Sequence, residues 1–177
     1  VLAEAAGTVP GRVAVHCLHQ HDAPAYDTSI EELLNEHGIG GESCNVAFAR
    51  EVLGRAADAL RKSLGAPLTV THLGLGTGRV DKVASNRRIL GDDGKVKVIR
   101  FSSSTIPEAI AAPEGVIDPN VRLVSFWNED RPLVSITHYA THPQSHYGQG
   151  GVSCDFVGLA RELREEAMPG VVHVHFN

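Results

Sequence analysis

Hydrophobic and polar positions follow two different periods along this chain, one typical of strands and one typical of helices. A period of two, with flanking turn residues, predicts strands over residues 12–18, 68–75, 95–101, 121–127, 132–141 and 171–176. A helical period of apolar residues predicts helices over residues 29–36, 44–64 and 154–168. Because these elements interleave and 121–127 and 132–141 form a hairpin, we expect a layered α/β fold with a mixed β-sheet and flanking helices.

The same periods predict which side chains are buried. In the strand over 12–18 the buried face is expected to hold Val13, Val15 and Cys17, and in the strand over 132–141 it is expected to hold Val134 and Ile136. The side chains of the helix over 154–168 that we expect to face inward are Phe156, Leu159, Ala160 and Leu163.

Local signals predict caps, turns and loops. Ser29 and Glu32 have the spacing of a capping box at the start of a helix. The run Gly74, Gly76 and Gly78 indicates a turn, because it lacks the third glycine spacing of a dinucleotide site and no clear helix follows it. Residues 102–119 are expected to form a loop.

Composition limits the class of protein. The chain has 177 residues, of which 42% are hydrophobic and 21% charged, and a net charge of -5; these values indicate about one globular domain. Without a basic cluster we expect no nucleic-acid partner, and the short apolar runs predict no transmembrane segment. Three scattered cysteines provide no disulfide scaffold. The first residues read as the end of a helix and the last as an uncapped strand, so we expect residues 1–177 to be an incomplete domain, truncated at both ends.

The clustering of histidines indicates metal chemistry. Of ten histidines, His19 and His21 lie at positions i and i+2, where the apolar strand over 12–18 runs out. His142 ends the later strand, directly before Pro143. A metal site gathers ligands from several strand ends, so we expect His142 to meet one or both of the first two. The histidines expected to have structural roles are His16, His37, His72, His146 and, with less weight on structure, the pair His173 and His175.

Two families of metal enzymes with an H-x-H motif fit poorly. A metallo-β-lactamase-like site needs His-x-His-x-Asp-His, and the residues here, from His19 to Pro24, lack the terminal pair. In an amidohydrolase barrel strands alternate with helices, which the hairpin over 121–141 interrupts.

Three motifs, in order, resemble the neutral, non-lysosomal ceramidases. The stretch Leu18-His19-Gln20-His21-Asp22-Ala23-Pro24 is similar to the family's T-H-T-H-S-G-P signature. The stretch Ser85-Asn86-Arg87-Arg88 shares Asn and Arg with its N-R-S-P motif. The third match is Ala140-Thr141-His142-Pro143-Gln144-Ser145 followed by Cys154-Asp155-Phe156-Val157-Gly158, which resembles H-P-T-S and D-N-x-G-Y.

This resemblance implies a zinc-dependent hydrolase of amide bonds with a lipid-like amide substrate, such as an N-acylsphingosine, and an extracellular or periplasmic location. It implies that His19 and His142 are zinc ligands, that His21 is an active-site histidine near the metal and that Arg87 orients the substrate. The family's serine nucleophile and its remaining Glu and Tyr ligands would lie beyond Asn177. With two zinc ligands residues 1–177 would bind zinc weakly and have no amidase activity.

Two alternatives stay open. The chain is either another H-x-H metal-dependent amidohydrolase or a non-catalytic binding module with the ceramidase-like fold, because Gln20 and Asp22 change the immediate surroundings of the ligands. In the metal-site interpretation, the imidazoles of His19 and His142 should lie within about 4 Å of each other. Arg87 should then project toward the same cleft.

Overall fold

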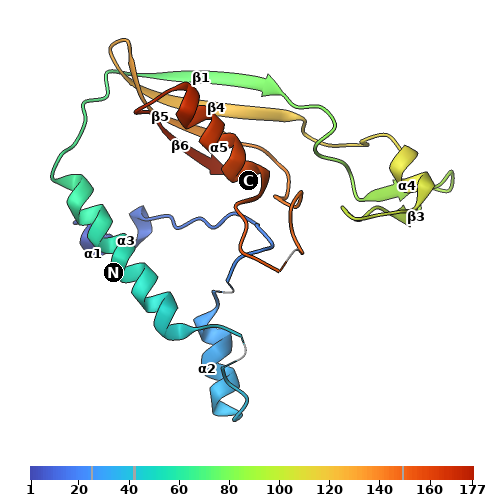
Figure 1. Ribbon diagram of the computed structural model, residues 1–177, viewed down its shortest axis with the longest axis horizontal. Coiled ribbons are helices and arrows are strands. Elements are labelled where there is room, and N and C mark those ends of the chain that lie inside the picture. The colour runs from blue at the N-terminus through green and yellow to red at the C-terminus, as the bar shows by residue number, and fades with distance from the viewer. Residues whose placement is uncertain (25, 42, 149) are drawn as a thin grey trace. The chain divides into compact units, whose positions relative to one another are not determined.

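The computed structural model describes residues 1–24, 26–41, 43–148 and 150–177 (Figure 1). It divides into two compact units, one of Val1–Cys17 with Ala23–Thr69 and one of Leu18–Asp22 with Val70–Asn177. We describe each unit by itself. In the described part of the chain, no helix is both long enough and apolar enough to cross a membrane.

The first unit is helical. It contains α1 (Leu2–Ala5), the 3-10 helix η1 (Pro10–Arg12), α2 (Thr28–Glu36) and α3 (Val46–Leu64). Small residues form its interior, since Ala49 and Ala57 on α3 are each 1% exposed. The helices predicted over 29–36 and 44–64 are therefore confirmed, and Asn45 caps α3 by accepting the amide of Phe48 at 3.0 Å.

The cap of α2 differs from the prediction. Asp27, not Ser29, is the N-cap, and its carboxylate accepts the backbone N–H groups of Ser29 and Ile30 at 3.0 Å each. Glu32 therefore closes no capping box with Ser29. Asp27, two residues before Ser29, binds the free amides of Ser29 and Ile30, which leaves no capping role for the serine hydroxyl.

A buried carboxylate fixes the loop that follows α2. Glu31 is 3% exposed, and its carboxylate accepts the backbone N–H groups of Gly41, Ser43 and Cys44. The hydrogen bond from Gly41 is the largest cause of the lowered pKa of Glu31, and burial opposes it. Glu31 is thus explained as a structural residue.

The strand predicted over 12–18 is wrong. After η1 the chain is extended but pairs with no strand among the described residues, and Val15 is 67% exposed. A strand persists only where a neighbouring strand satisfies its backbone groups, and alternation of side chains alone does not supply one. Cys17, expected to be buried, is exposed.

The second unit contains the sheet. Its strands are β1 (His72–Arg79), β4 (Asn120–Asn128), β5 (Arg131–His138) and β6 (Val172–Phe176), in the order β1-β4-β5-β6. The first two pairings are antiparallel, and β5 pairs with β6 in parallel through the crossover helix α5 (Asp155–Ala167), which lies along β6 in Figure 1. The mixed sheet with its helices confirms the layered α/β fold, the hairpin and the last strand.

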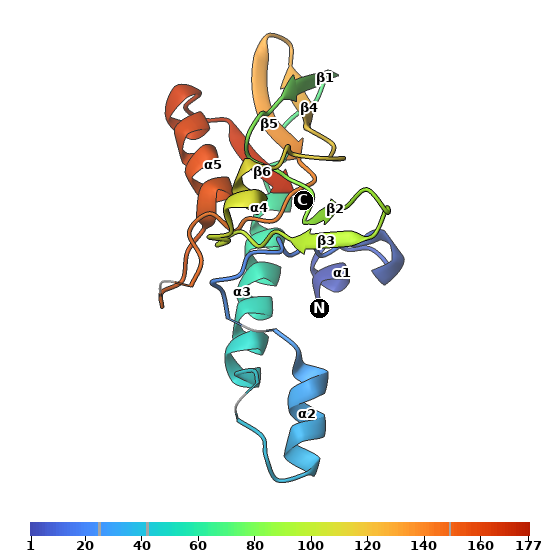
Figure 2. The same cartoon turned by 90° about the vertical axis from the view of Figure 1, so that its right-hand side faces the viewer.

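A small hairpin completes this unit. Strands β2 (Arg88–Leu90) and β3 (Val96–Ile99) pair around a turn at 91–94, and Figures 1 and 2 show them apart from the larger sheet. The segment 102–119 is not all loop, because α4 (Pro107–Ala111) forms within it. Proline at the first helical position, followed by Glu and Ala, favours this short helix.

The buried face of β5 is the opposite of the predicted one. Leu133, Ser135 and Tyr139 are 4–5% exposed, whereas Val134 and Ile136 are only half-buried. Helix α5 decides this, because its Arg164 reaches His173 on β6, which stands beside Ser135 in the sheet. Side chains alternate along β5 between the two faces of the sheet, as predicted. Which face the crossover helix covers is set by the β5–α5–β6 connection and not by hydrophobicity alone.

The inward face of α5 also differs from the prediction. The helix buries Asp155 and Val157, while Leu159 is 46% and Leu163 66% exposed, and Ala160 is exposed as well. Only its first turn is deeply buried. The apolar stripe is present along the helix, but most of its side chains are exposed in the described structure.

The glycine run lies inside β1 and forms no turn. The strand begins at His72 instead of residue 68 and continues through Gly78. Gly74 explains why a glycine stands here, since a Cβ at this position would lie 2.6 Å from Ser125 Oγ and 3.1 Å from Trp127 Nε1. The Trp127 indole donates to Ser125 Oγ at 2.8 Å directly above it.

We predict that Gly74→Ala lowers the free energy of unfolding by about 1–3 kcal/mol, because the new methyl group displaces Ser125 and strains its hydrogen bond with Trp127. Gly78→Ala is the matched control, because a Cβ at this position of the same strand meets no atom within 4 Å. Urea denaturation of both variants measures the difference. Equal stabilities for the two would contradict the packing explanation.

Candidate metal centre and adjoining cavity

Three histidines from two distant segments of the second unit meet. One ligand atom from each of His19, His21 and His142 lies within 4.8 Å of the other two. The ring centroids of His19 and His142 are 4.1 Å apart, those of His19 and His21 are 5.0 Å apart, and those of His21 and His142 are 5.8 Å apart. The structure thus brings together His19 and His142, which the sequence placed at one site, and adds His21 to the same group of donors.

The segment that carries His19 and His21 is fixed by its polar neighbours. The Asp22 carboxylate accepts the backbone N–H of Gly148 at 3.0 Å, and the Asp22 carbonyl accepts that of Ser153 at 3.0 Å. The Gln20 side-chain amide donates to the Ser153 carbonyl. These contacts tie the segment 18–22 to the loop that follows His142. Gln20 and Asp22, two of the departures from the ceramidase signature, thus hold these segments together.

The second segment continues the edge of the sheet. The Tyr139 amide still pairs with the Phe176 carbonyl at 3.1 Å, and His142 and the buried Pro143 follow as the strand ends. Beyond them the Asp155 carboxylate accepts the backbone N–H groups of Ser145 and His146 at 3.0 and 2.9 Å. The loop therefore leaves the sheet at His142 and is fixed again a few residues later.

Asp155 is ionised in this position. It is 1% exposed, and burial alone would raise its pKa. The hydrogen bonds from the amides of His146, Phe156 and Ser145 outweigh burial and lower the pKa. Its φ of 50° lies in the left-handed region, which aspartate tolerates better than most residues. The sequence contained a signal for this residue, the aspartate that opens a helix after the His-Pro pair, but not its hydrogen-bonding partners.

Burial and neighbouring charges lower the pKa of His142. Loss of solvent around the ring is the largest cause of its lowered pKa, followed by the neighbouring His19 and His21 and by Arg87. A neutral imidazole has a free lone pair, which a metal ligand needs. The same interaction shows that the charge of Arg87 acts on His142.

Gln144 contacts His21. Its amide nitrogen lies 3.0 Å from Nε2 and 3.2 Å from Nδ1 of that ring. Donation to a ring nitrogen uses the lone pair that a metal would need. Rotating the carboxamide by half a turn presents its oxygen instead, so that one ring nitrogen donates to Gln144 and the other stays free for a metal.

Arg87 and His142 line one cavity of about 840 Å³, whereas His19 and His21 are not among its described lining residues. The Arg87 guanidinium lies 5.8 Å from the centre of the Phe101 ring, within cation–π range. Its backbone is fixed because the Arg100 amide donates to the Arg87 carbonyl at 2.8 Å. Arg100 and Phe101, both in this cavity wall, were not singled out from the sequence, because no motif surrounds them.

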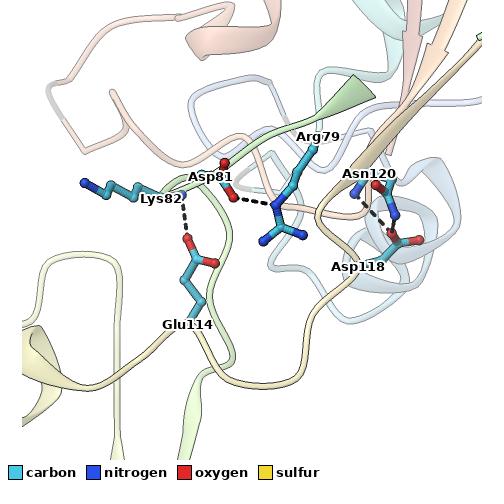
Figure 3. Close-up of polar contacts among 6 residues, drawn as sticks. All are labelled: Arg79, Asp81, Lys82, Glu114, Asp118 and Asn120. Carbon is cyan, nitrogen blue, oxygen red and sulfur yellow. Dashed lines mark hydrogen bonds and ion pairs between the residues drawn. The ribbon is translucent and has the colours of Figure 1, made fainter. Parts of the chain in front are cut away.

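The chain between β1 and Arg87 is fixed by polar contacts, which Figure 3 shows. Arg79 pairs with Asp81 at 2.7 Å, and the Glu114 carboxylate accepts the backbone N–H of Lys82. The Glu114 carbonyl also accepts the amide of Asn86 at 2.6 Å. The position of Arg87 therefore depends on pairing between two loops.

The remaining histidines do not join the donor cluster found among the described residues. His72 stacks on Trp127 at 5.9 Å between ring centroids. His173 is 2% exposed, and burial is the main cause of its lowered pKa. His175 lies 2.8 Å from the Thr137 hydroxyl. These contacts agree with structural roles in the sheet.

None of the family models, curated proteins or solved structures with which the chain was compared matches it. The three-histidine cluster and its cavity are therefore interpreted from their own contacts and from the three motifs.

We predict that Asp155→Asn frees the loop after His142 and costs about 1–3 kcal/mol, because a buried amide offers one oxygen where a carboxylate accepted three N–H groups. Hydrogen exchange at the amides of Ser145 and His146 should accelerate. Glu162→Gln, a change on the exposed part of α5, is the control and should alter neither.

The pH dependence of the wild type follows from the same contacts. Because folding lowers the Asp155 pKa, its contribution is complete above about pH 4 and is lost as the pH falls through the folded-state value. The Asn variant should lack this loss. Unchanged exchange at both amides in the variant would show that Asp155 does not hold the loop.

Proposed function

We propose that this chain carries the zinc site of a metal-dependent amide hydrolase that resembles the neutral ceramidases. One observation carries the proposal: ligand atoms of His19, His21 and His142 lie within 4.8 Å of one another beside a cavity that also holds Arg87. The resemblance in sequence and the geometry of the site point independently to the same residues.

The donor set suits zinc. Three imidazoles and a fourth position open to water or substrate are a recurrent arrangement of catalytic zinc, with Zn–N distances of about 2.0–2.1 Å. The ligand atoms lie within 4.8 Å of one another. Rotation of the rings toward a common point would bring each nitrogen to the Zn–N distance from one zinc ion. With His21 as third ligand, the site does not depend on residues beyond Asn177 for its first three donors.

Bound zinc would lower the pKa of a coordinated water and polarise the amide carbonyl. The chain's own residues supply the rest. His19, His21 and His142 each supply one ligand nitrogen, and Gln144 orients the His21 ring. Arg87 binds a polar group of the substrate from the cavity wall.

The cavity supports a lipid-like amide as substrate. Most of its lining is polar; the apolar wall available to an acyl chain consists of Val83, Phe101 and Val116, all three exposed, together with Ile117 and Phe156. The resemblance adds an extracellular or periplasmic location to the proposal.

The binding-module alternative has less support. It rests on Gln20 and Asp22, but these side chains bond to Ser153 and Gly148 and leave the three imidazoles as donors. A module that binds without catalysis would retain zinc affinity and hydrolyse no amide, which the experiment below distinguishes.

Zinc affinity tests the site directly. We predict that His19→Ala, His21→Ala and His142→Ala each reduce zinc affinity by about tenfold to hundredfold or more, because each removes one of three ligands. Competition with a chromogenic chelator measures this loss. His37→Ala is the control, because this exposed histidine caps α2 in the other unit.

Each outcome decides a part of the proposal. If zinc affinity survives all three substitutions, the assignment of His19, His21 and His142 as zinc ligands is wrong. A selective loss of zinc-stimulated hydrolysis of an N-acyl amide in His21→Ala, with affinity unchanged, would return His21 to the proton-moving role implied by the resemblance. Hydrolysis of an N-acyl amide by the zinc-loaded chain would exclude the binding module.

A further inference from the structure

The cavity beside the histidines is positively charged. Among the described residues that line it are Arg87, Arg88 and Arg100, and none of those lining residues is an aspartate or glutamate. A neutral substrate needs no such excess of positive charge. The electrostatics of this wall therefore carry information about the substrate.

The charges of Arg87 and Arg88 have no ion-pair partner in the described part of the chain. Each ion pair that the structure contains there involves other residues. Arg87 contacts the face of Phe101, which leaves its hydrogen-bond donors available. An arginine fork without a carboxylate is suited to bidentate binding of a carboxylate or phosphate.

Arg100 adds a positive charge to the same wall. Its two terminal nitrogens donate to backbone carbonyls, including those of Ala109 at 3.0 Å, Ala112 at 2.9 Å and Asn86 at 3.0 Å. These carbonyls are neutral and leave the positive charge uncompensated. Its Nε is buried and has no hydrogen-bond partner in the described structure, so Arg100 contributes charge to the wall and no contact with the ligand.

A nearby carboxylate is engaged elsewhere. Glu114 follows the segment whose carbonyls bind Arg100, but its side chain accepts the backbone N–H of Lys82, as Figure 3 shows. It therefore forms no ion pair with Arg100 in this structure. The positive charge of the cavity wall persists because the acidic residue nearby fixes the backbone instead.

We infer, resting on the function proposed above, that the substrate of this site is an amide with an anionic group close to the scissile bond, in the manner of an N-acyl amino acid. Arg87 binds the anionic group, and the apolar wall takes the acyl chain. His142 lines the same cavity, which places the amide next to the histidine cluster.

The hydrolysis of such a substrate balances with water alone. Water adds to the amide carbonyl, the C–N bond breaks, and the leaving nitrogen takes up a proton. N-dodecanoylglycine and water thus give dodecanoate and glycine, with no oxidant, reductant or further reactant.

Binding to the zinc-free protein tests the inference separately from catalysis. The two probes are N-dodecanoylglycine and N-dodecanoylethanolamine, which share the acyl chain and amide but carry a carboxylate or a hydroxymethyl group. We expect the full chain to bind the glycine conjugate at least tenfold more tightly in calorimetry, below micelle-forming concentrations and at low salt, since added salt weakens the attraction. Arg87→Gln should abolish the preference, and Arg50→Gln, on the exposed surface of α3, should retain it.

The outcomes separate this inference from the proposed function. Equal binding of both probes, or a preference that survives Arg87→Gln combined with Arg88→Gln, overturns the anionic substrate even if zinc-dependent hydrolysis occurs. A preference that depends on Arg87 in a protein that binds no zinc upholds the anion-binding cavity and overturns only the hydrolase.

Discussion

The structure of the candidate site depends on polar contacts that hold two unpaired segments together. His19 and His21 belong to a stretch without secondary structure, and His142 lies just past the end of β5. The hydrogen bonds of Asp22 with Gly148 and Ser153 replace the strand pairing that would otherwise fix such segments. Ligand atoms that share a metal must be positioned to within a few tenths of an ångström. These contacts therefore determine whether a metal site exists at all.

The same site combines positive charge with neutral ligands. Burial, the neighbouring imidazoles of His19 and His21, and the charge of Arg87 together lower the pKa of His142. Three imidazole donors suited to a cation therefore lie beside a wall suited to an anion. An amide that carries an anionic group would suit both, with its carbonyl at the zinc that the histidines would hold and its charged group at the arginine.

Much of the fold and part of the site could be predicted from the sequence. Periodicity identified the long helices and the hairpin. It predicted a strand running as far as His142, but β5 ends earlier, at His138. The burial of Ser135 in place of Ile136 was missed, because the face of a strand that becomes buried depends on where the crossover helix lies. The strand over 12–18 was wrong because a strand needs a partner, and periodicity contains no information about partners. The contact of Asp22 with Gly148 was equally out of reach, since it joins loops that no pattern relates.

The central claim is that His19, His21 and His142 together form one zinc site. X-ray absorption at the zinc edge of the zinc-loaded full chain tests it most directly, because imidazole and thiolate ligands differ in distance and in scattering. The account predicts three imidazole nitrogens at about 2.0–2.1 Å and no sulfur. A sulfur ligand at about 2.3 Å would contradict it, since the exposed thiols of Cys17 or Cys154 would then bind the metal in place of a histidine.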